Sequence, residues 1–196
     1  MATSRTETRT TRAPRADAVR NRARIVAAAR DLFASDGLEV ALDRVAESAG
    51  VGIGTLYRNF PSREALVEAA YRTQSEEIIE AGHRFAGELP PDEALAALFA
   101  EYLRTAAAKR GMKEVILAQL GADAPVFADV RAATREMIGR ILDAGRAAGH
   151  VRDDVDTETV SRLIGGLSMT ALHDDDPAVA EGMIRVVLDG LRPPPS

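Results

Sequence analysis

Hydroxyl, guanidinium and amide side chains gather in one short segment, residues 53–59, which reads IGTLYRN. Thr55 and Tyr57 carry hydroxyls that suit phosphate oxygens, and Arg58 can bind either a phosphate or a guanine. Ile53 can contact a thymine methyl group. Gly54 adds no side chain, so the start of a helix can approach its ligand closely. These residue types predict that the segment binds nucleic acid.

The glycines of this region allow a second interpretation. Gly50, Gly52 and Gly54 spell G-x-G-x-G, a pattern found in loops that bind nucleotide phosphates. Such a loop requires a preceding strand and a surrounding βαβ unit. Residues 42–49 have helical spacing instead, and no Lys-Ser or Lys-Thr pair follows the glycines. The sequence therefore disfavours a phosphate loop.

Residues that support catalysis or hold a metal show no useful spacing. His83, His150 and His173 are scattered, and the chain has no H-E-x-x-H motif and no cysteine. The serines lack a G-x-S-x-G context. We therefore expect no catalytic residue, no metal and no cofactor, and we do not expect an enzyme.

Two short helices joined by a tight turn are predicted to position the segment. Leu56 and Phe60 are four residues apart and form the inner face of the second helix. Gly50 supplies the positive φ that the turn needs. The inner face of the first helix has the spacing i, i+3, i+4 and i+7 and comprises Leu42, Val45, Ala46 and Ala49. This is a helix-turn-helix pattern, whose second helix enters the major groove of DNA.

The stretch AGVGIGTLYRNFPSREAL resembles the signature of the tetracycline-repressor (TetR) family of transcription regulators. The resemblance covers residues 20–66, and the rest of the chain is similar only in length and helical character. The matching positions are Val45, Ala46, Ala49, Gly50, Val51, Thr55, Leu56, Tyr57, Phe60, Ser62 and Leu66. The resemblance implies an N-terminal DNA-binding head and a C-terminal helical domain.

The resemblance also implies which residues contact DNA. The family uses the positions of Thr55, Tyr57, Asn59 and Arg63 mainly on the DNA backbone, and those of Asp43, Arg44, Ile53 and Gly54 near bases. Independently of the resemblance, Arg20, Arg22 and Arg24 near the start of the first helix are placed to approach a DNA backbone. The expected DNA-binding set is Arg20, Arg24, Arg44, Ile53, Gly54, Thr55, Tyr57, Arg58, Asn59 and Arg63.

Three positions depart from the family pattern. Asn59 stands where the family often has His, and Arg63 stands where it often has Lys. Ala41 stands where the family often has Thr or Ser, so a helix cap and a phosphate-binding hydroxyl are missing.

The charge of the chain is unevenly distributed. Residues 1–66 hold 11 arginines and 8 acidic residues, whereas residues 67–196 hold 14 basic and 22 acidic residues. A basic end beside an acidic remainder favours an anionic partner for the first part. The chain has no apolar run of membrane-spanning length, its N-terminus has no apolar signal-peptide core, and it has no cysteine. We expect a cytoplasmic protein that does not bind membranes.

The helical periodicity predicts an all-α fold with about nine helices. Residues 1–17, with four arginines among polar residues, are expected to be a disordered basic arm. Residues 18–66 form the expected DNA-binding domain, and residues 67–196 form the expected effector-binding and dimerisation domain. In this second domain Gly111 is expected to end one helix, and a separate short helix is expected over residues 112–120.

Two further sites are expected in the second domain. The family resemblance implies a small-molecule pocket, for which ordinary core packing is the alternative. Its candidate residues are Tyr71, Phe99, Tyr102, Met112, Gln119, Phe127 and Met137. The resemblance also implies a four-helix dimer interface, and the small side chains at 165–166 would let a second helix approach. Its candidates are Leu163, Gly166, Leu167 and Val187.

Taken together, these patterns predict a homodimeric transcriptional regulator. It would bind a double-stranded DNA operator as a repressor and leave it when a small-molecule effector binds. The alternative is a helical protein that binds or sequesters small molecules and no longer reads DNA. The choice between repressor and activator stays open.

Overall fold

The computed structural model describes residues 12–170 and 177–194. Over these residues the chain forms eight α-helices and no strand, so the expected all-α class is confirmed. The chain divides into two compact units, residues 1–66 and residues 67–196. Within the described ranges, no helix combines the length and apolar character needed to cross a bilayer. Each unit is described separately below.

The first helix of the N-terminal unit is α1 (Arg12–Asp36). It packs through an apolar stripe in which Ile25 and Ala29 are completely buried. Gly37 follows the helix with a φ of 83°, so the chain turns there without a side-chain clash. The helix begins five residues before Asp17, so the expected disorder of residues 12–16 is wrong. Residues 1–11 of the expected arm lie outside the described residues.

The next two helices, α2 (Leu42–Ser48) and α3 (Ile53–Asn59), are only seven residues long each. Gly50 lies between them with a φ of 63° and makes the predicted tight turn. Helices this short are marginal in isolation, so their stability comes from packing. The apolar side chains that hold them are buried as the spacing predicts, and they are Val45, Ala46, Ala49, Leu56 and Phe60. The predicted helix-turn-helix is therefore present.

The fourth helix, α4 (Arg63–Glu88), contains the boundary between the two units in its first turn. Ser62 begins it as predicted, because its Oγ accepts a hydrogen bond from the backbone N–H of Ala65 at 3.3 Å. Glu64 lies in the first turn. Hydrogen bonds from its own backbone N–H and from the Ser62 hydroxyl lower the pKa of this carboxyl.

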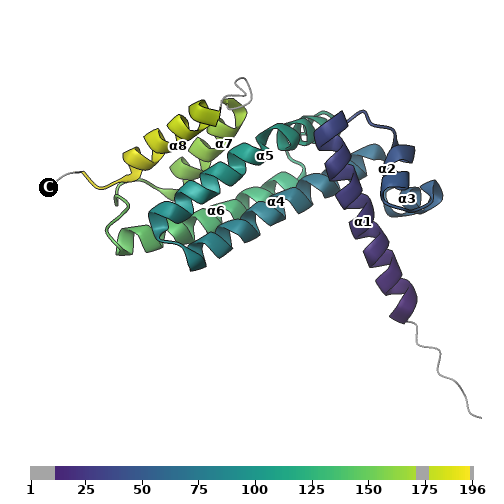
Figure 1. The fold of residues 1–196 in the computed structure, drawn as a ribbon, viewed down its shortest axis with the longest axis horizontal. Helices are drawn as coiled ribbons and strands as arrows, with labels where there is room; N and C mark the ends of the chain where they lie inside the picture. The colour runs from purple at the N-terminus through teal and green to yellow at the C-terminus, as the bar shows by residue number, and fades with distance from the viewer. Residues whose placement is uncertain (1–11, 171–176, 195–196) are drawn as a thin grey trace, which may run out of the picture. The chain divides into compact units, whose positions relative to one another are not determined.

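The C-terminal unit continues with α5 (Pro91–Leu120), α6 (Pro125–Ala147), α7 (Thr157–Thr170) and α8 (Pro177–Leu191). Helix α5 packs against α6, α7 and α8, and α6 packs against α7 (Figure 1). The shared core is aliphatic and is centred on Leu95, Leu98, Phe99, Met137, Ile138 and Ile141. These residues recur at helical spacing, which explains why the periodicity predicted the helices.

Helix α5 runs through Gly111 without a break, so the separate helix expected over residues 112–120 is wrong. A glycine inside a helix costs about 1 kcal/mol relative to alanine. Met112 and Ile116 are completely buried just beyond it, and their packing offsets this cost. The described residues consequently form eight helices where about nine were expected.

Candidate nucleic-acid interface

Helix α3 has one buried face and one exposed face, as a groove-binding helix requires. Leu56 is completely buried and Phe60 is 1% exposed, so they attach the helix to the head. Ile53 is 37% exposed and Tyr57 is 50% exposed on the opposite side. Arg58 is also exposed. A surface that presents an isoleucine, a phenol and a guanidinium can contact both base edges and phosphates.

Thr55 organises the polar side chains on α3. Its Oγ1 accepts a hydrogen bond of 2.8 Å from Nη2 of Arg58. Its carbonyl accepts another of 2.8 Å from Nδ2 of Asn59. Accepting a bond leaves the Thr55 hydroxyl proton available as a donor, and a guanidinium has five N–H donors. The three side chains are therefore held in place while each keeps the capacity to bind a phosphate oxygen.

Arg20 and Arg44 from the expected DNA-binding set are both exposed and paired with carboxylates of the head. Arg20 pairs with Asp17 on its own helix. Nη2 of Arg44 lies 2.8 Å from Oδ2 of Asp36. Exposed pairs of this kind contribute little stability, so a phosphate can compete for either guanidinium.

Two other expected DNA contacts, Arg24 and Arg63, bind carbonyls of the head. Nη2 of Arg24 donates to the Gly50 carbonyl at 3.2 Å. Arg63 is half-buried, and its Nη1 donates to two carbonyls of the loop before α2. Any DNA contact by these arginines must therefore use their remaining N–H groups, and that contact stays a prediction. Arg22, which was also expected to approach the DNA backbone, lies over the ring of Phe60.

Six of the seven side chains expected to line an effector pocket are buried in the C-terminal unit. They are Tyr71, Phe99, Tyr102, Met112, Phe127 and Met137. The seventh, Gln119, is exposed, so its expected position on an inner face is wrong. It lies three residues beyond Ile116, which is completely buried. The amide is exposed because it lies in the last turn of α5, where Leu117 and Leu120 are exposed as well.

Two tyrosines place polar groups among these buried side chains. The hydroxyl of Tyr102 lies 3.2 Å from Oγ1 of Thr134. The ring of Tyr71 meets that of Phe127 edge to face, with centroids 5.7 Å apart. Burial raises the pKa of both phenols, so both stay protonated near neutral pH. This interior can offer hydroxyl hydrogen bonds to a mostly apolar ligand.

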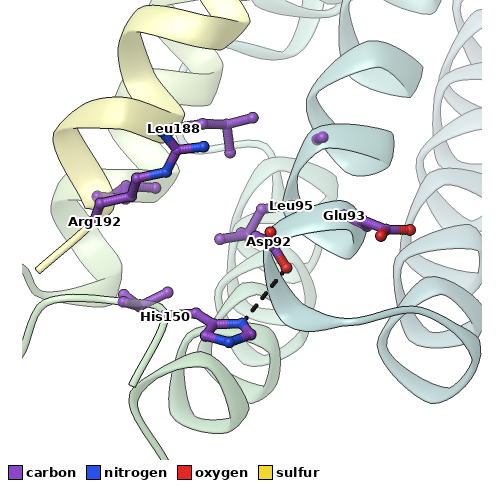
Figure 2. Close-up of a pocket in the computed structure, with 9 residues that line it drawn as sticks. Asp92, Glu93, Leu95, His150, Leu188 and Arg192 are labelled. Carbon is purple, nitrogen blue, oxygen red and sulfur yellow. Dashed lines mark ion pairs between the residues drawn. The ribbon is translucent and has the colours of Figure 1, made fainter. Parts of the chain in front are cut away.

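A surface pocket of about 170 Å³ lies elsewhere in the same unit, where the start of α5 meets the end of α8. Figure 2 shows Asp92 and His150 facing each other at its edge, where Nδ1 and Oδ1 are 3.5 Å apart. Leu95 and Leu188 belong to its apolar part. No spacing in the sequence pointed to this pocket, because its residues come from three separate segments.

The expected dimer residues lie on α7 and α8 with different exposures. Leu163 is 43% exposed, and Gly166 is exposed with room for a methyl group that would meet nothing within 4 Å. Leu167 and Val187 are half-buried and pack against the core. Val186, omitted from the expected set, is 73% exposed. Helix α8 therefore presents apolar surface that the single chain does not cover.

The described residues contain no group of three or more histidine, aspartate or glutamate side chains that could hold a metal ion. Comparison with known proteins supports a regulatory function instead. Residues 25–70 match the family model for bacterial regulatory proteins of the tetR family. Residues 90–193 match the model for the SbtR-like transcriptional regulator C-terminal domain.

Solved structures extend the similarity over most of the chain. The crystal structure of a TetR transcriptional regulator from Streptomyces coelicolor shares 39% identity and a TM-score of 0.76, over 89% of this chain and 99% of that one. A TetR transcription regulatory protein from Mycobacterium vanbaalenii shares 36% identity and a TM-score of 0.74, over 92% and 99%.

A curated relative supports the assignment of the N-terminal unit as a helix-turn-helix domain. An HTH-type transcriptional regulator of Staphylococcus aureus (strain bovine RF122 / ET3-1) is 43% identical over 53 residues. The match spans 26% of this chain and 29% of that relative, less than a third of its length. From the head, the C-terminal domain and the solved structures together, the chain belongs to the TetR family of helix-turn-helix transcriptional regulators, which is a non-enzymatic family.

Proposed function

We propose that this protein is a homodimeric repressor that a small-molecule effector releases from its operator. The observation that carries the proposal is the exposed face of α3, which is held over the buried Leu56 and Phe60. A helix held this way can enter the major groove while its hydroxyls and guanidinium remain accessible. Two such heads, one from each protomer, would read a roughly palindromic site with half-sites ~34–36 Å apart or a multiple of that distance.

Within each half-site the side chains have different roles. The residues assigned to the bases are Ile53 and Gly54 at the start of α3, together with the exposed Arg44 and Arg58. The residues assigned to phosphates are Arg20, Thr55, Tyr57 and Asn59. Phosphate contacts supply affinity and register, whereas contacts to bases supply sequence preference.

The dimer is proposed to form through α7 and α8 of both protomers. The exposed Leu163 and the open Gly166 form a site where a second helix can approach closely. Leu167 and Val187 lie beside this surface and join it to the core. Exposed apolar side chains on α8, Val186 above all, support the same assignment because a second protomer would remove them from water.

The effector is proposed to bind among the buried tyrosines of the C-terminal unit. Tyr102 belongs to the same core cluster as Phe99 and Met137, and the ring of Tyr71 meets that of Phe127. A mostly apolar molecule with one or two hydrogen-bonding groups fits this chemistry. If the ligand prefers a protomer arrangement in which the heads no longer match successive grooves, DNA affinity falls by at most the ratio of the ligand's affinities for the two arrangements.

The test begins with selection of bound sequences from a random duplex library. The expected product is an inverted repeat, and the full-length protein should bind it as a dimer. If about eight phosphates are neutralised, log affinity should fall with log salt at a slope of roughly −7. An effector that weakens this binding should also raise the melting temperature of the DNA-free protein. A protein that enriches no sequence yet is stabilised by small molecules would instead be a sequestering protein.

A further inference from the structure

Neither helix of the two-helix unit α2–α3 has a side-chain cap at its N-terminus. Ala41 and Gly52 occupy the N-cap positions that precede α2 and α3, and neither forms a side-chain cap hydrogen bond. The loops that enter, join and leave the two helices carry backbone carbonyls that need donors. In this protein arginines from the flanking helices α1 and α4 meet these carbonyls at all three junctions.

The entry junction, the loop before α2, is held by Arg63 from the first turn of α4. Its Nη1 donates to the carbonyl of Leu38 at 2.6 Å and to that of Val40 at 2.8 Å. Arg63 is half-buried, so it is partly protected from competing water. One guanidinium nitrogen therefore fixes two points of the loop 23 to 25 residues earlier in the chain.

The middle junction, the turn between α2 and α3, is held by Arg24 from α1. Its Nη2 donates to the Gly50 carbonyl at 3.2 Å. The guanidinium lies so close to the turn that a Cβ on Gly50 would overlap Nη2. A side chain at Gly50 would therefore strain the φ of 63° and would also displace the Arg24 guanidinium.

The exit junction, the end of α3, is held by Arg22, which also comes from α1. Its guanidinium carbon lies 4.3 Å from the centroid of the Phe60 ring. Its Nη1 lies 3.5 Å from the carbonyl oxygen of Asn59, the last residue of α3. A cation at a helix C-terminus is favoured by the helix dipole, and a guanidinium over an aromatic face is favoured by its quadrupole.

We propose that Arg22, Arg24 and Arg63 are positioning residues that fix the orientation of α3 before DNA arrives. They act through loop carbonyls and the Phe60 ring, so their effect on the operator is indirect. Holding α3 in its bound orientation reduces the ordering cost of docking. The inference builds on the proposed DNA-binding function, but its first test does not require DNA.

Arg20 provides a matched control on the same helix as Arg22 and Arg24. It has the same charge, is exposed, and pairs with Asp17 of α1 rather than with the two-helix unit. Removing Arg20 should change electrostatic attraction to DNA without changing how α3 is held. Removing Arg24 should change how α3 is held, beyond any effect of the lost charge.

The first experiment measures amide hydrogen exchange along α3 in the DNA-free, full-length protein. Arg22→Ala and Arg24→Ala should each accelerate exchange in residues 53–60 by about threefold to tenfold, the effect of one modest hydrogen bond. Arg20→Ala should leave this exchange unchanged, and the core of α5 and α6 should be unaffected in every variant. Equal exchange in all four proteins would overturn the proposal whether or not the protein binds DNA.

The second experiment uses the selected operator and an unrelated duplex at two salt concentrations. Arg24→Ala should weaken operator binding by roughly tenfold and unrelated DNA by much less, with an unchanged salt slope. Arg20→Ala should weaken both duplexes and make the slope shallower. Arg24→Lys, which keeps the charge and one donor, should recover part of the operator affinity. Uniform weakening by Arg24→Ala with a shallower slope would make Arg24 a phosphate contact and refute its positioning role.

A double-mutant cycle with Gly50 tests whether the Arg24 contact exists in solution. Gly50→Ala both strains the positive φ and displaces Arg24, whereas in an Arg24→Ala background only the strain remains. The operator affinity lost through Gly50→Ala should therefore be severalfold smaller in that background. Additive losses would show that Arg24 does not lie over the turn.

Discussion

Replacing Gly166 on α7 should have opposite effects on the stability of one protomer and on its association with a second protomer. Within the protomer a methyl group at this position would meet no atom within 4 Å. Replacing an exposed helical glycine by alanine gains about 1 kcal/mol of helix stability. Gly166→Ala should therefore stabilise the protomer, while its methyl group should hold two protomers slightly apart and weaken the dimer.

Gly166→Glu makes the same test stronger. The exposed site accommodates a glutamate in a single protomer, so the variant should fold. At a desolvated dimer contact an unpaired charge costs about 3–5 kcal/mol. At about 1.4 kcal/mol per factor of ten, the lower figure already raises the dimer dissociation constant more than about 100-fold.

Sedimentation across a concentration series, with circular dichroism to check helicity, measures both effects. The wild type should be a dimer at micromolar concentration, and Gly166→Glu should be a folded monomer. Ala132→Glu adds the same charge at an exposed position on α6 and should remain a dimer. A Gly166→Glu variant that stays dimeric would show that α7 does not pair the protomers there, and the proposed interface would be wrong.

Other substitutions test the DNA contacts, the core and a helix cap. Tyr57→Phe should weaken binding to all DNA sequences by roughly 1 kcal/mol. Arg58→Ala should lose about 1–3 kcal/mol of binding free energy, mainly at one base pair per half-site. Unchanged binding by both variants would contradict the docking of α3 in the major groove. In thermal unfolding, Gly82→Ala should destabilise the protein by about 1–3 kcal/mol, because the new Cβ would overlap the sulfur of a buried methionine. Gly87→Ala on the same helix is the control: its Cβ would meet nothing within 4 Å, so it should stabilise the protein by up to about 1 kcal/mol. Equal shifts for the two variants would contradict that packing. At the start of α7 the Asp156 carboxylate accepts a hydrogen bond of 2.6 Å from the backbone N–H of Thr159, and this bond lowers the pKa of the carboxyl. The stability that the charged cap contributes is therefore complete above about pH 4 and is lost as pH falls through the lowered pKa. Asp156→Asn should remove that part of the acid dependence of the melting temperature, and an identical pH profile would exclude the cap.

Much of the fold followed from local sequence patterns because the determining interactions are local. The spacing of Leu56 and Phe60 sets the buried face of α3 within a single helix. Gly50 predicted the turn correctly because the turn requires a positive φ, which glycine adopts without strain. The prediction that a helix ends at Gly111 was wrong because α5 continues through this glycine, and the residues just beyond it are buried in the core. Local preference loses to tertiary packing at such positions.

The DNA-binding surface was predicted less completely than the fold. Residue type identified Tyr57 and Arg58 as exposed polar groups on α3. It did not show that Arg24 and Arg63 reach carbonyls 23 to 26 residues away, since an arginine bound to a carbonyl and one bound to a phosphate look alike in sequence. Gln119 was misplaced because helical spacing does not show that the last turn of α5 is left exposed, together with Leu117 and Leu120.

The continuity of α4 constrains how proteins of this kind can exchange parts. Its first residue, Arg63, holds the loop before α2, and Tyr71, eight residues later, is buried in the other unit. Each residue added or removed between them would rotate one end relative to the other by about 100° and shift it by about 1.5 Å. A join between a head and another effector domain therefore has to keep α4 continuous, because contacts in both units depend on this one helix.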